Sequence, residues 1–209
     1  MNKLFALVLI VVLLGCQNAG NNYFTGIVEY AYSFTNDLLN ADSIANTRPA
    51  KGILRYDTLN YQSVFIGPDT QTYFYSGSYN KVLSKTGDTG NYQCEDYGTF
   101  TDSVVSFKLY DTDEKILGYS CKILEIQKKN SWLRYYVSND LRIAPATYNK
   151  HASYNWDFYG DKANGGLILR SEHRLKYFTV KSIATSLSKR DDKFKAFEMD
   201  DALFSRYCR

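Results

Sequence analysis

Cysteine and histidine side chains are the first candidates for chemistry in this sequence, which has four Cys and two His. A cysteine nucleophile needs a neighbour that stabilises its thiolate, and only His151 and His173 could do so. No Cys-x-x-Cys pair occurs, and no ligand residues cluster around the histidines, so we expect neither thiol catalysis nor a zinc site. Glycine-rich phosphate-binding motifs are also absent. We therefore predict a protein that is not an enzyme and holds no metal or cofactor.

The amino terminus offers a different chemistry, at Cys16. Lys3 precedes an apolar run of eleven residues, Leu4 to Leu14, which Gly15 and Cys16 follow. This run is too short for a transmembrane helix, which needs about 20 residues, but it matches the apolar region of a signal peptide. The segment resembles a bacterial lipoprotein signal, which implies cleavage before Cys16 and lipidation of its thiol. The alternative is an ordinary secretory signal with an incidental cysteine.

This resemblance divides the chain into three parts. We expect a lipoprotein signal peptide at residues 1–15, a lipidated amino terminus and tether at 16–22, and a single β-rich domain at 23–209. Gln17 rather than Asp follows the cysteine, which by resemblance favours the outer membrane. The tether lacks the acidic residues that resemble surface-export signals, so we expect the periplasmic face rather than the cell surface.

Charge gives no indication of a nucleic-acid partner. The chain has 25 Lys and Arg against 22 Asp and Glu, a difference too small to indicate an anionic partner. We expect the local cluster of Lys122, Lys128, Lys129 and Arg134 to form a solvated strand face. The expected partners are the membrane, through the lipid anchor, and a lipid or another envelope protein.

The other three cysteines suit an exported protein. Cys94, Cys121 and Cys208 permit one disulfide and leave one thiol over, and the pairing cannot be read from the sequence. We expect a structural bridge and a buried thiol rather than a reactive site.

Apolar and polar residues alternate with a period of two along most of the chain, which is typical of half-buried β-strands. The first such strand runs from Phe24 to Phe34. Further strands are predicted at 52–56, 61–66, 72–75, 79–84, 104–109, 119–127, 132–137, 167–175 and 176–187. Short, turn-like separators indicate antiparallel pairing. Helix signals are limited to Asp37–Ala45 and to a segment that Asp200 could cap.

Several short motifs carry a family resemblance. They are Gly118-Tyr119-Ser120-Cys121-Lys122, the strand at 132–137 with Ser138-Asn139-Asp140-Leu141, and Gly165-Gly166-Leu167-Ile168-Leu169. Together they resemble exported GLPGLI-type proteins of Bacteroidota, although the Leu-Pro of the full motif is missing before Gly166. That family has no firmly assigned activity. At fold level it is similar to the LolA and LolB lipoprotein carriers, whose curved sheet forms a half-barrel around acyl chains.

The pattern and the resemblance together predict a mainly β protein. We expect a single strongly curved antiparallel sheet, a LolA-like half-barrel, with one or two short helices. An aromatic content of 16%, with 19 Tyr and 12 Phe, suits a wide apolar concave face that could hold a lipid. The alternative is that these aromatic residues simply fill the core.

A stretch without clear pattern, residues 139–166, is the other candidate for binding. Its aromatic residues are Tyr148, Tyr154, Trp156, Phe158 and Tyr159. Such a loop could cap an acyl pocket or stack on a sugar, or it could plug the open end of the sheet. We therefore predict a lipid-anchored, non-enzymatic envelope protein that binds a lipid or lipidated partner. The alternative is a structural or interaction lipoprotein, or a glycan-binding module that uses the aromatic loop 148–159.

Overall fold

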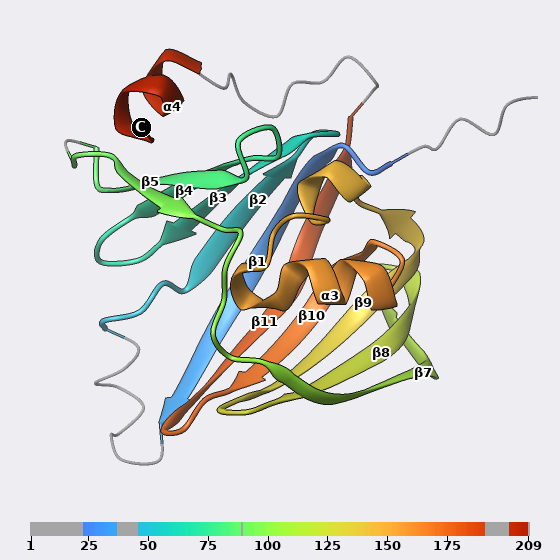
Figure 1. Cartoon of the computed structure of the whole chain (residues 1–209). Coiled ribbons are helices and arrows are strands. Elements are labelled where there is room, and N and C mark those ends of the chain that lie inside the picture. Colours follow the sequence, from blue (N-terminus) through green and yellow to red (C-terminus); the bar gives the residue numbers. More distant parts are fainter. Residues whose placement is uncertain (1–22, 37–45, 89, 191–200, 209) are drawn as a thin grey trace, which may run out of the picture.

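The computed structural model describes residues 23–36, 46–88, 90–190 and 201–208 of the chain (Figure 1). The predicted signal peptide, Cys16, the tether and the predicted helix at 37–45 lie outside these residues. Among the helices that are described, none has the length and apolar character needed to cross a membrane.

Within the described residues, eleven strands form one antiparallel sheet that does not close on itself. Its spatial order is β6-β5-β4-β3-β2-β1-β11-β10-β9-β8-β7. The strands are β1 (Gly26–Asn36), β2 (Lys51–Tyr56), β3 (Asn60–Ile66), β4 (Gln71–Ser76), β5 (Lys81–Thr86), β6 (Gln93–Asp96), β7 (Val104–Ile116), β8 (Tyr119–Lys128), β9 (Trp132–Arg142), β10 (Gly166–Arg174) and β11 (Phe178–Lys189).

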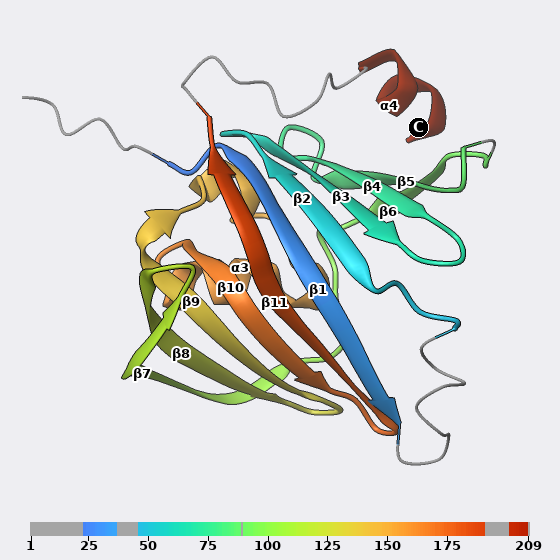
Figure 2. The same cartoon turned by 180° about the vertical axis from the view of Figure 1, so that it is seen from behind.

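The sheet is strongly curved, and a helical segment lies against its concave face (Figures 1 and 2). This segment contains the short turns η1 (Pro145–Thr147) and η2 (Ser153–Asn155) and the helix α3 (Trp156–Lys162). Period-two alternation directs one set of side chains into the space between sheet and helix. In β1, for example, Val28 and Tyr30 are buried whereas Glu29 between them is exposed. The expected mainly β, curved antiparallel fold is confirmed.

The path of the chain divides the sheet into two arms that meet at β1. From β1 the chain runs outward through β2 to β6, and from the opposite edge it returns inward through β7 to β11. Residues 97–103 connect the two outer edges and cross in front of the concave face (Figure 1). We call this segment the strap. It is bonded to the first arm by Tyr97 N–H to the Asn80 carbonyl, and to the second by Lys129 N–H to the Ser103 carbonyl.

Burial of Lys128 under the strap corrects one expectation. Its side chain is 1% exposed, so it does not belong to a solvated face. The strap supplies Asp102, whose Oδ2 lies 3.4 Å from Lys128 Nζ, and Phe100, whose ring centroid is 4.9 Å from the same atom. Strand periodicity could not reveal this, because a distant segment covers the strand end. Asp102 also accepts a 2.6 Å hydrogen bond from Ser131 Oγ, which fixes the strap to the β8–β9 turn.

A disulfide joins Cys94 of β6 to Cys208, the residue directly after the carboxyl-terminal helix α4 (Asp201–Tyr207). Phe204 of this helix stacks on Tyr79 with 5.4 Å between ring centroids. Lys81 Nζ donates a 2.7 Å hydrogen bond to the Cys208 carbonyl. These contacts place α4 beside the edge of the first arm, which agrees with a helix near the carboxyl terminus, although Asp200 itself lies outside the described residues.

The remaining differences concern short or irregular segments. β6 was not predicted, because its sequence Gln93-Cys94-Glu95-Asp96 is short and polar. The stretch at 139–166, predicted without regular structure, begins with the last residues of β9 and contains α3. α3 escaped detection because Gly160 lies within it and its seven residues show no clear helical periodicity.

Candidate functional site

A cavity of about 340 Å³ lies between the concave face, the strap and the helical segment. Strands from both arms and the segment before α3 contribute its walls. The lining residues are Tyr30, Tyr32, Leu54, Tyr56, Tyr61, Ser63, Phe65, Tyr73, Tyr97, Tyr135, His151, Tyr154, Trp156, Ile168, Ser171 and Ser182. Its volume is at the lower end of the range for small-molecule sites, about 300–1,000 Å³.

Strand periodicity explains why so many tyrosines meet in this cavity. Tyr30 and Tyr32 are two residues apart on β1, and Tyr61, Ser63 and Phe65 are successive same-face positions on β3. Residues at this spacing point to the same face of a sheet. Curvature of the sheet then brings these faces toward one another, so side chains from distant strands converge.

At the inner end of the cavity, aromatic rings surround His151. Its imidazole centroid is 4.6 Å from the ring of Tyr97, 4.8 Å from that of Tyr75 and 5.2 Å from that of Trp156. The ring of Tyr61 stacks on Tyr75 at 4.9 Å. Tyr75 and His151 are at most 1% exposed, so this cluster forms a buried floor.

Among the described residues that line the cavity, His151 carries the one buried side-chain polar atom without a hydrogen-bond partner. Its Nε2 lies 2.7 Å from the hydroxyl of Tyr61, whereas its Nδ1 is buried and has no hydrogen-bond partner. Burial lowers the pKa of His151 to about 4, because desolvation disfavours the charged imidazolium. The imidazole is therefore neutral near pH 7, so one of its two nitrogens is a donor and the other an acceptor.

The phenol groups of the cavity fall into two sets. Three are bonded within the chain: Tyr30 to the Ile168 carbonyl at 2.6 Å, Tyr61 to His151, and Tyr73 to Gln71. The hydroxyls of the other five have no hydrogen-bond partner among the described residues. Tyr154 is exposed, and none of the remaining four hydroxyls, those of Tyr32, Tyr56, Tyr97 and Tyr135, is a fully buried unpaired atom. Their oxygens thus keep accessible surface and can bond to water or a ligand.

Four of the unpaired hydroxyls stay protonated. Desolvation by burial raises the pKa of Tyr32, Tyr56, Tyr97 and Tyr135 above the ordinary value for a phenol. Each is therefore a neutral group that both donates and accepts. No Asp, Glu, Lys, Arg or Cys side chain lines the cavity as described. The aromatic side chains of the site can therefore stack on a ring of a ligand, and its uncharged hydroxyls can form hydrogen bonds with that ligand.

Two of the five predicted ligand-binding residues, Tyr154 and Trp156, line the cavity. Tyr154 adopts a left-handed backbone conformation, with φ of 57°, that is uncommon for a bulky residue. Its side chain is 54% exposed and contacts the ring of Phe100 in the strap at 5.3 Å. Trp156 is partly buried against the core, with its ring 5.2 Å from that of Tyr61.

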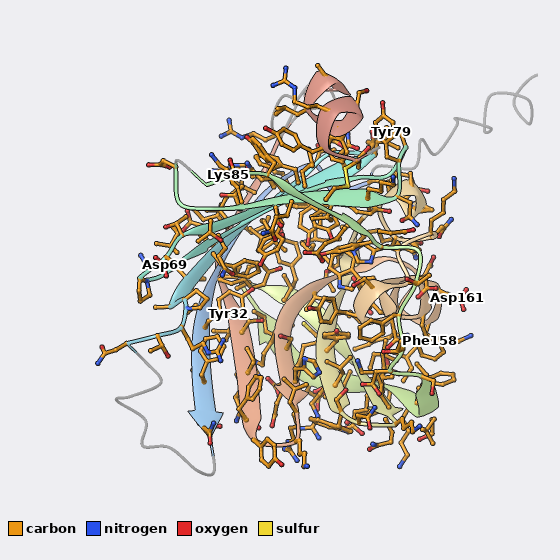
Figure 3. All side chains as sticks on the ribbon, turned by 60° about the vertical axis from the view of Figure 1, so that its left-hand side comes forward. Tyr32, Asp69, Tyr79, Lys85, Phe158 and Asp161 are labelled. Carbon is orange, nitrogen blue, oxygen red and sulfur yellow. A yellow bond between two sulfur atoms is a disulfide. The ribbon has the colours of Figure 1, made fainter. Side chains whose placement is uncertain are left out.

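The other three predicted residues pack away from the cavity. Tyr148 lies against Gly160 of α3, and Tyr159 is buried and donates a hydrogen bond to the Gly166 carbonyl. Phe158 meets Phe107 of β7 edge to face at 5.4 Å. In Figure 3, Phe158 and Asp161 lie near each other at the right of the view, and Tyr32 lies at the left.

The strand tyrosines and His151 are the cavity residues that sequence reasoning missed. The signal that could have found them is position: Tyr30, Tyr32 and Tyr61 occupy same-face positions on their strands. Periodicity identifies that shared face but not whether packing fills it.

Metal and thiol chemistry find no support among the described residues. No group of three or more His, Cys, Asp or Glu side chains there is arranged to hold a metal ion. The thiol of Cys121 is buried, and burial raises its pKa, so it is a poor nucleophile. The observed Cys94–Cys208 bridge resolves the pairing that the sequence left open.

Comparison with known proteins gives no family. No protein-family model matches the sequence, and no curated protein matches it. Among solved structures, PNGF-II in a P21 crystal form covers 87% of this chain at 18% identity, with a TM-score of 0.47. PNGF-II in a C2 crystal form covers 86% at 16% identity, with a TM-score of 0.45. This chain spans only 30% and 29% of those chains, and at such low similarity the match says nothing of what it binds.

Proposed function

We propose that this chain is a lipid-anchored envelope protein that binds a carbohydrate ring in its tyrosine-lined cavity without transforming it. The observation that carries the proposal is the set of eight tyrosines around one cavity, five of them with hydroxyls unpaired among the described residues. Aromatic faces contact the apolar C–H faces of a sugar, and phenol hydroxyls exchange hydrogen bonds with its hydroxyl groups.

The lining supports a sugar better than it supports an acyl chain. Only Leu54 and Ile168 contribute aliphatic side chains to the walls. An acyl chain offers no hydrogen-bonding groups, so it would displace water from the phenol hydroxyls and leave them unpaired. Each such loss costs about 1–3 kcal/mol. Binding of a lipid or lipidated partner stays a prediction, and it is an alternative outcome of the experiments below.

The anchor and its location belong to the same proposal and rest on residues 1–22 of the sequence. Acylation of Cys16 would hold the protein at the outer membrane, with the periplasmic face preferred. Mass spectrometry of the amino-terminal peptide tests this directly. A diacylglycerol-modified Cys16 supports the anchor, whereas an unmodified Cys16 or retained residues 1–15 would contradict it.

The binding proposal is tested on the full chain in detergent. A glycan array identifies a sugar that binds, and its affinity is then measured by calorimetry for the unaltered chain and for Trp156→Ala and Tyr154→Ala. Both substitutions should weaken binding at least about tenfold, because each removes an aromatic face from the cavity wall.

Phe158→Ala is the matched control, because Phe158 belongs to the same helical segment but packs on Phe107 outside the cavity. It should leave the affinity within about twofold. Absence of any glycan ligand, together with saturable uptake of a fatty acid, would replace the carbohydrate proposal with the lipid one.

A further inference from the structure

An apolar groove of about 310 Å³ lies next to the cavity and is open to solvent. Its walls come from strands β1, β3, β4 and β11 and from residues 48–49, which precede β2. The lining residues are Tyr32, Phe34, Arg48, Pro49, Phe65, Gln71, Tyr73 and Val180. We call it the outer groove.

The outer groove and the cavity share three residues, Tyr32, Phe65 and Tyr73. The ring of Phe65 meets that of Tyr32 edge to face at 5.6 Å and that of Tyr73 at 5.8 Å. The same aromatic rings thus form one wall of both hollows. Each hollow alone lies at the lower end of the volume range of ligand sites, whereas the two in continuation suit an elongated ligand.

Arg48 gives the outer groove a charge that the cavity lacks. Among the lining residues of the two hollows, it is the one Asp, Glu, Lys or Arg. Its side chain is exposed, and its guanidinium lies 5.8 Å from the centroid of Phe178. No ion pair joins Arg48 to any described carboxylate. Its guanidinium can therefore donate hydrogen bonds to an anionic group of a ligand.

Gln71 adds a neutral donor near the same groove. Its Oε1 accepts a hydrogen bond of 3.1 Å from the hydroxyl of Tyr73, which orients the side-chain amide. The amide N–H groups then remain to bond with an oxygen of a ligand. One end of the combined site is therefore neutral and aromatic, and the other has a cation beside a polar donor.

We propose that the cavity and the outer groove form one extended site for an acidic oligosaccharide, with a neutral ring in the cavity and a carboxylate-bearing ring beside Arg48. This inference rests on the proposed carbohydrate function and narrows it to sugars that contain uronic acids. Stacking on Tyr32 and Phe65 spans the junction, and the guanidinium of Arg48 sets the direction in which the sugar chain lies.

The test uses the full chain and pairs of probes that differ only in charge. The acidic probes are trisaccharides of galacturonate and of mannuronate and a hyaluronan tetrasaccharide, and the controls are their carboxyl-reduced counterparts. At least one acidic probe should bind about fivefold more tightly than its reduced form, the size expected of an exposed charge pair. This preference should shrink when salt rises from about 0.05 M to about 0.5 M.

Variants assign the preference to Arg48. Arg48→Gln should abolish the preference by lowering the affinity for the acidic probe to that for its reduced form, whereas Arg48→Lys should retain most of the preference. Arg206→Gln removes an exposed cation of α4, outside both hollows, and should change neither affinity.

Three results would overturn the inference. Equal affinity for acidic and reduced probes would refute the extended acidic site while leaving the neutral cavity function intact. A preference that survives Arg48→Gln would place the carboxylate elsewhere. Failure of every sugar, acidic or neutral, would refute the carbohydrate function and this inference with it.

Discussion

The hydroxyl of Tyr61 lies 2.7 Å from Nε2 of His151, and this hydrogen bond joins β3 to the segment that precedes α3. The two residues are 90 positions apart in the sequence, and both are buried. The bond fixes the floor of the cavity, because Tyr61 also stacks on Tyr75 and contacts Trp156. Its loss would loosen the sheet and the helical segment from each other.

Tyr61→Phe should therefore lower the free energy of unfolding by about 1–3 kcal/mol, because it leaves a buried imidazole nitrogen without a partner. Denaturation by urea measures this change. Tyr73→Phe is the control, since the Tyr73 hydroxyl bonds only to exposed Gln71, and it should cost about 0.5 kcal/mol or less. Equal losses in the two variants would contradict the role assigned to the Tyr61–His151 bond.

Stability should fall on mild acidification because of His151. Its folded pKa is about 4, below the ordinary value of 6.5, so between these values the unfolded chain binds more protons than the folded one. The contribution of His151 to the free energy of unfolding is complete above about pH 6.5. It is lost as the pH falls toward 4, and the loss amounts to at most about 3 kcal/mol. Burial lowers the pKa of His173 to about 4 as well, which adds in the same direction.

Unfolding midpoints in urea, measured at about pH 7.5, about pH 6 and about pH 5, report this pH dependence of stability. His151→Gln should flatten the pH dependence even if it lowers stability overall. An unchanged slope in that variant would show that His151 is not the group that takes up the proton.

The disulfide should stabilise the fold and hold α4 against β6. Cys94 and Cys208 are 114 residues apart, so the bridge closes a long loop in the unfolded chain. Cys208→Ser should lower the free energy of unfolding by about 2–4 kcal/mol. Peptide mapping without reductant should recover a peptide pair that joins Cys94 to Cys208 and an unmodified Cys121. A pair containing Cys121 would contradict the structure.

Gly160→Ala tests the packing of α3. Alanine favours a helix over glycine by about 1 kcal/mol, but a Cβ here would lie 2.1 Å from the ring of Tyr148. The clash should dominate and destabilise the protein by about 1–3 kcal/mol in thermal or chemical unfolding. Asp161→Ala, at an exposed position of the same helix, should change stability by about 0.5 kcal/mol or less. If Gly160→Ala instead stabilised the protein, the ring of Tyr148 would have moved aside at little cost, which would contradict the packing described for α3.

Local periodicity predicted most of the sheet because one face of each strand is buried. β1, β3 and β8 lie close to their predicted bounds for this reason. β7 extends to Ile116, well beyond the predicted end at 109, because its outer residues lie at an exposed edge and alternate less clearly in burial. The length of an edge strand depends on its pairing with the neighbouring strand, and the alternation of apolar and polar residues gives no information about that pairing.

The cavity could be predicted only in part, because it depends on contacts between distant residues. The aromatic loop indicated Tyr154 and Trp156, but the sequence did not distinguish them from Tyr148 or Tyr159, which pack inward. Whether a tyrosine such as Tyr30 fills the core or lines a space is decided by sheet curvature and by the helical segment opposite it. Neither is a property of the strand that carries the residue.

The two tryptophans of the chain permit the most direct test of the carbohydrate cavity. Trp156 lines the cavity, whereas Trp132 lies on β9 beneath the guanidinium of Arg174. Trp132→Phe leaves Trp156 as the sole tryptophan, and its fluorescence should shift saturably when the sugar identified on the glycan array is added. The reciprocal variant, Trp156→Phe, should give no saturable shift from Trp132. A response from Trp132 alone, or none from Trp156 under conditions where calorimetry detects binding, would contradict the account.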